Sequence, residues 1–128
     1  MAARPDAVGA ALVGSHARGQ ARADSDVDLM IVTTSPGGYL SDTSWTRAFG
    51  ETESVEVEEW GAVTSVRVRY VMGAEVEFGI TTPEWTKTSP IDPGTKRVVQ
   101  AGFRILLDRD GSLRALHEEC ADHASYKD

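Results

Sequence analysis

The apolar run at 27–34 places the strongest constraint on the fold of this chain. After its first two residues it reads Leu-Met-Ile-Val-Thr-Thr, so apolar or β-branched side chains lie on both faces of an extended segment. A strand of this kind is typical of the centre of a sheet that is covered on both sides. We therefore expect packing layers on both faces of a sheet, with the acids Asp26 and Asp28 only at the entrance to its central strand.

The remaining elements are expected on both sides of this strand in the chain. Before it, the pattern predicts a strand at 7–13 that ends at Gly14-Ser15, then a short helix at 16–23. After it, the pattern predicts a turn at 35–38, a helix within 40–49, strands at 65–71 and 74–80, an irregular segment at 83–94, a helix near 95–100, a peripheral strand at 103–107 and a last helix from 112. This order predicts an α/β or α+β fold with a mixed β-sheet and helices packed against it.

The strands at 65–71 and 74–80 are expected to form a β-hairpin. A three-residue loop with Gly73 at its left-handed third position places Tyr70 opposite Ala74. Counting outward from that pair gives the hairpin one apolar face and one charged face. The charged face carries two opposed pairs, Glu75 with Arg69 and Glu77 with Arg67.

Length and charge limit the classes of protein. The 128 residues suffice for one hydrophobic core, so we expect a single domain spanning 1–128. A net charge of −7 argues against binding to extended nucleic acid, which requires clustered Lys and Arg. The apolar stretch at 7–14 is too short to span a membrane and runs into basic residues instead of a cleavage site. Since the single cysteine excludes an internal disulfide, we expect a cytoplasmic protein.

One short segment is strongly acidic. Five glutamates fall within 51–59, and no basic residue accompanies them. We interpret them as a solvated rim, and an acidic surface for a cationic acceptor is the alternative.

Asp26 and Asp28 carry the first sign of chemistry. In a strand, residues two apart point to the same side, with Cα atoms about 6.6 Å apart. Two such carboxylates repel each other unless a cation lies between them, and their hard oxygen atoms suit Mg²⁺ or Mn²⁺. Glu77 on a neighbouring strand would complete a site for two metal ions, roughly 3.5 to 4 Å apart, suited to in-line phosphoryl displacement. Gly14-Ser15 supplies the complementary phosphate-binding turn at a helix N-terminus.

These motifs resemble a known family. The run Gly14-Ser15-His16-Ala17-Arg18-Gly19, followed by Ser25-Asp26-Val27-Asp28-Leu29, is similar to the signature of the minimal nucleotidyltransferases in the DNA polymerase beta superfamily. Val76-Glu77-Phe78 resembles the strand that carries the third carboxylate of this family. The resemblance therefore implies a polymerase-beta-like nucleotidyltransferase fold.

The resemblance also implies roles for individual residues. Gly14 and Ser15 would bind the nucleotide, with Ser15 on the β or γ phosphate. Asp26 and Asp28 would be metal ligands, and Glu77 would be the third ligand or the base for the acceptor hydroxyl. Arg18, with Arg22, would lie on the triphosphate, or both arginines would be solvated on a short helix. The third acid is Glu where Asp is commoner in the family.

The activity implied is the transfer of a nucleotidyl group, AMP from ATP, to an acceptor hydroxyl with release of pyrophosphate. The sequence does not identify the acceptor, which is a small molecule or a protein, and the protein is expected to form a homodimer or to bind a partner. The alternative function is that of an antitoxin which binds or adenylylates a HEPN-type toxin. A third interpretation is an inactive fold that binds only nucleotide.

Other candidate residues have simpler interpretations. His117, Cys120 and His123 are spaced like zinc ligands, but steps of three rotate around a helix and no fourth ligand is evident. Cys120 is better interpreted as a buried thiol on the apolar stripe of the last helix, which we expect to contain Leu113, Leu116, Cys120 and Ala124. For Trp45, Trp60 and Trp85, packing is favoured over base stacking.

Overall fold

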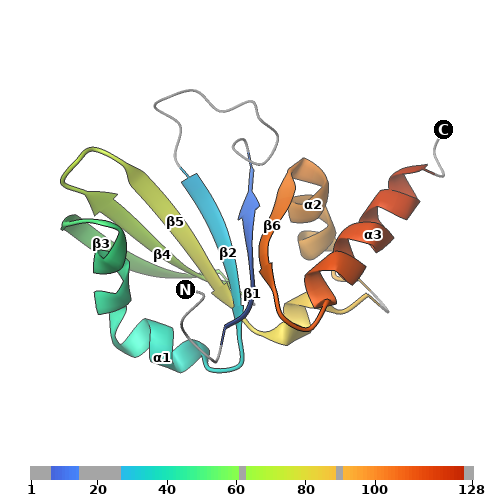
Figure 1. Ribbon diagram of the computed structural model, residues 1–128, viewed down its shortest axis with the longest axis horizontal. Coiled ribbons are helices and arrows are strands. Elements are labelled where there is room, and N and C mark those ends of the chain that lie inside the picture. Colours follow the sequence, from blue (N-terminus) through green and yellow to red (C-terminus); the bar gives the residue numbers. More distant parts are fainter. Residues whose placement is uncertain (1–6, 15–26, 61–62, 89–90, 126–128) are drawn as a thin grey trace.

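A computed structural model describes residues 7–14, 27–60, 63–88 and 91–125. Over these ranges the chain forms one mixed sheet with helices on both faces (Figure 1). The strands are β1 (Ala7–Val13), β2 (Val27–Thr33), β3 (Thr52–Trp60), β4 (Val63–Tyr70), β5 (Glu75–Thr81) and β6 (Phe103–Asp108). The helices are α1 (Pro36–Ser41), α2 (Pro93–Ala101) and α3 (Ser112–Ser125), with 3-10 helices η1 (Thr43–Phe49) and η2 (Pro83–Thr86). No helix in the described ranges is long and apolar enough to cross a membrane.

The strand order is β3-β4-β5-β2-β1-β6. The predicted central strand, β2, therefore lies beside β5, the second strand of the predicted hairpin. β2 pairs in parallel with β5, and every other neighbouring pair is antiparallel. The prediction for 27–34 is therefore confirmed, because β2 lies inside the sheet and its residues 30–33 are buried. Ile31 and Val32 are 1% and 0% exposed although they point to opposite faces.

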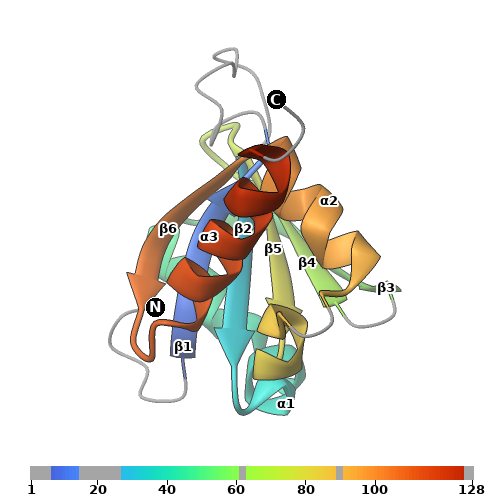
Figure 2. The ribbon, with the colours of Figure 1, turned by 90° about the vertical axis from the view of Figure 1, so that its right-hand side faces the viewer.

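Each face of the sheet has its own hydrophobic core. On one face, α2 and α3 cover β1, β2 and β6, and the core includes Met30, Val32, Phe103, Leu113 and Leu116 (Figure 2). On the other face, α1 and η1 cover β4 and β5, and the core includes Ile31, Tyr39, Tyr70, Phe78 and Ile80. Trp45 of η1 packs edge-on against Tyr39 and Phe78, with ring centroids 5.5 and 4.9 Å apart. Two layers of helix thus fix β2 and β5 from opposite sides.

The hairpin has the register predicted from the sequence. The N–H of Tyr70 donates to the carbonyl of Ala74 at 2.8 Å, and the N–H of Gly73 donates to the carbonyl of Tyr70 at 2.9 Å. Gly73 has φ +104°, the left-handed conformation expected of the third loop residue. The pairing places Arg69 opposite Glu75 and Arg67 opposite Glu77, which confirms the two charged pairs.

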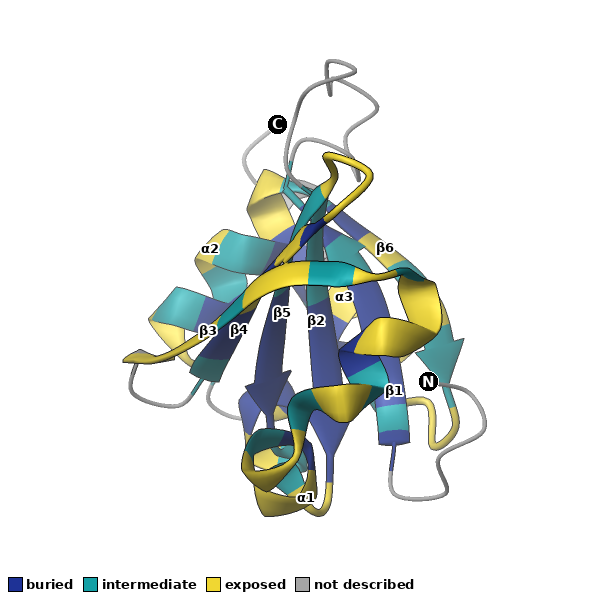
Figure 3. Cartoon of the chain, turned by 90° about the vertical axis from the view of Figure 1, so that its left-hand side faces the viewer, coloured by how far each residue is buried: buried dark blue, intermediate teal, exposed yellow. Residues whose placement is uncertain are grey.

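The acidic segment differs from the prediction in one respect. Its glutamates are exposed, as expected of a rim, but 52–60 forms the edge strand β3, an element that the sequence pattern did not predict (Figure 3). The reason is pairing with β4, which sets Glu56 opposite Arg67 and Val55 opposite Val68. Cross-strand partners therefore overcome the low strand propensity of glutamate.

Three helical segments also differ from the prediction. The turn expected at 35–38 is the start of α1, because Pro36 at the first position presets the helical backbone. The helix expected within 40–49 is divided at Asp42, whose carboxylate accepts from the N–H of Ser44 at 3.0 Å and begins η1. The helix expected near 95–100 starts at Pro93, where the Asp92 side chain accepts from the N–H of Thr95 at 3.1 Å.

Candidate active site

Asp28 and Glu77 lie on adjacent strands at the same level of the sheet. The parallel pairing of β2 with β5 makes them direct partners in register, so their Cα atoms are about 4.8 Å apart and their side chains leave the same face. That face is the one covered further along by α2 and α3. Both carboxylates line a groove of about 240 Å³. Its other lining residues are Val13, Leu29, Met30, Val63, Ser65, Gly79 and Val98.

Gly14 lies directly beside Asp28. It follows Val13, which pairs with Asp28 across β1 and β2, and its N–H donates to the carbonyl of Gly102 at 3.3 Å. Gly14 has φ +75°, and a Cβ added there would lie 3.0 Å from Oδ2 of Asp28. A glycine is needed here both for the left-handed backbone and for the space beside the carboxylate. The structure therefore brings Gly14, Asp28 and Glu77 together, as the sequence predicts.

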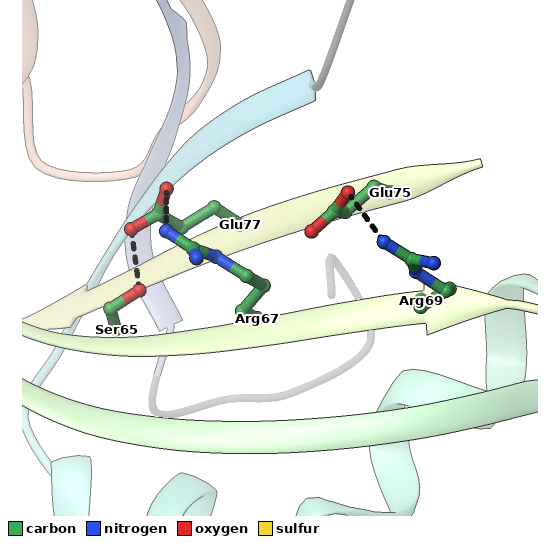
Figure 4. Close-up of polar contacts among 5 residues, drawn as sticks. All are labelled: Ser65, Arg67, Arg69, Glu75 and Glu77. Atoms are coloured by element: carbon green, nitrogen blue, oxygen red, sulfur yellow. Dashed lines mark hydrogen bonds and ion pairs between the residues drawn. The ribbon is translucent and has the colours of Figure 1, made fainter.

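Glu77 has two polar neighbours on β4 (Figure 4). The hydroxyl of Ser65 donates to Oε1 of Glu77 at 2.6 Å, and Nη2 of Arg67 lies 3.5 Å from Oε2. The Glu77 side chain is 34% exposed and lines the groove, so its carboxylate is partly accessible to water. The negative charge of Glu77 raises the pKa of the Arg67 guanidinium above its usual value. Glu77 thus has a hydroxyl and a guanidinium beside it on β4 and lies opposite Asp28 on β2.

Glu75 is the neighbour of Glu77 on the same face, but it has different surroundings. Its Oε2 lies 3.6 Å from Nη2 of Arg69, and Figure 4 shows this pair nearer the hairpin loop. Glu75 lines a separate hollow of about 300 Å³ with Arg67, Arg69 and residues of β3. Because Asp28 does not line that hollow, Glu75 and Glu77 have separate environments despite their spacing of two.

Sequence reasoning missed Ser65. The signal was present in the hairpin register, since Ser65 lies two residues before Arg67 and therefore on the same face. Ser65 pairs with Gly79, which has no side chain to separate the serine hydroxyl from Glu77. Extending the count of the charged face by one step would have found it.

Three of the predicted site residues lie outside the described residues: Ser15, Arg18 and Asp26. Within the described ranges, no group of three or more His, Cys, Asp or Glu side chains is placed to hold a metal ion. The pair that is described fits a hard divalent cation, because two carboxylates face one open groove from opposed positions of adjacent strands. Asp26, the other aspartate expected to bind metal with Asp28, precedes the first residue of β2 in the sequence.

The remaining candidates lie away from this groove. Cys120 is buried in the core under α3, and burial raises the pKa of its thiol. His117 is exposed, and its ring centroid lies 5.7 Å from that of Phe103. The side chains of Trp60 and His123 lie outside the described residues, whereas Trp45 and Trp85 pack in the two cores.

A mixed sheet that presents carboxylates from adjacent parallel strands beside a glycine turn defines the class of protein as a polymerase-beta-like nucleotidyltransferase. The chain belongs to the nucleotidyltransferase domain family, whose model matches residues 3–84. The match includes the glycine turn, both expected aspartates and Glu77. Membership of the superfamily is thereby confirmed, and the minimal subgroup stays a prediction.

A solved structure supports the fold. An aminoglycoside 6-adenyltransferase from Bacillus subtilis superposes with a TM-score of 0.54 at 12% sequence identity. The likeness covers 69% of this chain and 33% of that enzyme, so the chain spans about a third of its length. A search of the curated proteins finds no match. The family and the fold together support nucleotidyl transfer as the general activity.

Proposed function

We propose that this protein transfers the AMP group of ATP to an acceptor hydroxyl and releases pyrophosphate, acting in the cytoplasm. The observation that carries the proposal is the placement of Asp28 and Glu77 in one groove beside the turn at Gly14. In this reaction the acceptor oxygen forms a bond to the α phosphorus while the bond to the leaving pyrophosphate breaks. Such chemistry needs positioning and negative side chains that hold cations, both of which this groove offers.

In this proposal each residue of the site has its own role. Gly14 lets the chain turn close to the phosphates, and Ser15 and Arg18 would extend that contact along the triphosphate. Asp28, Glu77 and Asp26 would hold Mg²⁺ or Mn²⁺. Bound there, the cation supplies charge neutralisation for the triphosphate and for the leaving pyrophosphate. Glu77 also has the exposure and the charge needed to accept the proton of the acceptor hydroxyl.

The acceptor must bind beside the groove that holds Asp28 and Glu77. The groove of about 240 Å³ is open, so an acceptor that brings its own surface can approach it. We propose that a second copy of the chain or a HEPN-type toxin supplies that surface. Incubation with labelled ATP and Mg²⁺, alone and beside a candidate toxin, aminoglycosides and other hydroxyl acceptors, identifies the acceptor by transfer of the label.

Metal and nucleotide binding are expected to depend on each other. The clustered carboxylates need cations, and the triphosphate provides the remaining oxygen ligands of those cations. Calorimetry with a non-hydrolysable ATP analogue should show tight binding with Mg²⁺ and about a tenfold or larger loss with a chelator, the size of coupling expected between two ligands of one site. Equal binding of the analogue in both conditions would contradict the metal site and with it the proposed mechanism.

Substitution of Gly14 by Ala should weaken both stability and binding. The left-handed backbone costs an alanine about 1 to 2 kcal/mol, and the added Cβ would crowd Oδ2 of Asp28. The analogue should therefore bind about tenfold more weakly in the presence of Mn²⁺. Gly111→Ala is the matched control, because Gly111 has φ +79° and no atom lies within 4 Å of its added Cβ. Equal binding losses in the two variants would show that backbone strain, not crowding of Asp28, is responsible.

A further inference from the structure

Ser65 makes the shortest polar contact of the candidate site. Its hydroxyl donates to Oε1 of Glu77 at 2.6 Å, within the range of a charge-assisted hydrogen bond to a carboxylate. Ser65 is only 5% exposed, because it lies in β4 under the groove and pairs with Gly79. Water therefore competes poorly for this hydroxyl.

The second neighbour of Glu77 holds it less firmly. Arg67 stands 3.5 Å from Oε2, beyond the usual hydrogen-bond distance, and its side chain is 45% exposed. Exposed ion pairs of this kind are screened by water and salt and fix a geometry weakly. Of the two contacts, the one with Ser65 is therefore the one that sets the orientation of the carboxylate.

Glu75, two residues before Glu77 on β5, has an arginine partner but no serine partner. It has its own arginine, Arg69 at 3.6 Å, in the same opposed position as Arg67 for Glu77. Ser65 lies on β4 two residues before the arginine that opposes Glu77. The same position relative to Glu75 is occupied by Arg67, which carries no hydroxyl. The serine thus distinguishes the glutamate in the groove from the glutamate beside the hairpin loop (Figure 4).

We infer that Ser65 is the positioning residue for Glu77: its hydroxyl fixes Oε1 and so presents Oε2 to the groove shared with Asp28. The inference rests on the proposed function, in which Glu77 acts as a metal ligand or a base. A long glutamate side chain has three rotatable bonds, and a partner that removes this freedom lowers the cost of bringing the carboxylate to its working geometry. Partners of metal-binding carboxylates commonly change affinity or activity by about 10- to 100-fold when they are removed.

The test compares Ser65→Ala with Ser65→Thr, which keeps the hydroxyl. For each variant we would measure kcat, the KM for ATP, the unfolding temperature, and Mn²⁺ affinity by calorimetry in the presence of a non-hydrolysable ATP analogue. Ser65→Ala should fold normally and lower kcat and Mn²⁺ affinity by about 10- to 100-fold, with KM for ATP changed less than about threefold. Ser65→Thr should restore both quantities to within about threefold of the wild-type protein. Arg69→Gln, which removes the partner of Glu75, is the matched control and should leave both unchanged.

The outcomes separate this inference from the proposed function. If the wild-type protein binds Mn²⁺ with the analogue and Ser65→Ala binds it equally well with unchanged kcat, the positioning role is wrong and the proposed function stands. If the wild-type protein neither binds Mn²⁺ nor transfers the nucleotidyl group, both fail together. Should the threonine prove too large for the buried position, its unfolding temperature would show this, and the Mn²⁺ affinity of Ser65→Ala alone would decide.

Discussion

Changing Glu77 to Gln is expected to lower the rate of nucleotidyl transfer by about two orders of magnitude or more, as for a lost base or metal ligand. Glutamine keeps the shape of the side chain and can still contact Ser65, but it carries no charge for a cation or a proton. The fold and weak nucleotide binding should remain, because Glu77 is one third exposed and Gly14 and Asp28 are untouched. Rates measured at saturating Mg²⁺ and ATP would give the comparison.

Glu75→Gln is the control that this strand provides. Glu75 shares its face with Glu77 and has the same kind of arginine partner, yet it lines a different hollow. An exposed cross-strand ion pair contributes well under about 1 kcal/mol, so this variant should keep both its stability and its activity. Loss of transfer in Glu75→Gln with retention in Glu77→Gln would show that the third carboxylate has been assigned to the wrong residue.

The strand β2 and the hairpin can be predicted because their signals are local. An apolar run on both faces identifies β2 as an inner strand whatever lies beside it. In the hairpin, Gly73 fixes the loop length, and the loop length fixes which side chains oppose one another. The opposed positions of Arg67 and Glu77 follow from that count and agree with the observed pairing.

The edge strand β3 depends on a partner that local pattern does not reveal. Its alternation is present, since Val55 and Val57 lie opposite the buried Val68 and Val66. However, Val57 is 47% exposed, and four of the nine strand residues are glutamates. Such a segment buries too little surface to be recognised as a strand by itself. It forms a strand because it pairs with β4 along its length, with Glu56 opposite Arg67 and Val57 opposite Val66.

Only part of the candidate site could be predicted from the sequence, because some of its contacts also depend on how the strands pair. Motif spacing identifies acids and a glycine turn, but the contact between Ser65 and Glu77 arises from two strands and appears only when their register is extended. The pairing of Asp28 with Glu77 likewise needs the parallel contact of β2 and β5, which the chain order leaves open. The roles of Ser15, Arg18 and Asp26 stay predictions, since these residues lie outside the described ranges.

Asp28→Asn is expected to abolish the stabilisation of the protein by metal and nucleotide while leaving the fold intact. A ligand at 100 times its dissociation constant raises the free energy of unfolding by about 2.7 kcal/mol. The wild-type protein should show a gain of this size with Mg²⁺ and an ATP analogue, and Asp28→Asn should show almost none, because asparagine is neutral and a poor substitute for a carboxylate ligand. Thermal unfolding with and without the two ligands measures the difference.

Asp108→Ala should show the opposite behaviour. The carboxylate of Asp108 accepts from the N–H groups of Leu113 at 3.1 Å and Arg114 at 2.9 Å, so it caps the start of α3. Asp108 does not line the groove that holds Asp28 and Glu77. Its loss should lower the free energy of unfolding by about 1 kcal/mol, and the gain from Mg²⁺ and the analogue should stay at its wild-type size. If Asp28→Asn instead lost stability without ligands and kept the ligand-induced gain, Asp28 would be a structural carboxylate and the groove would not be the metal site.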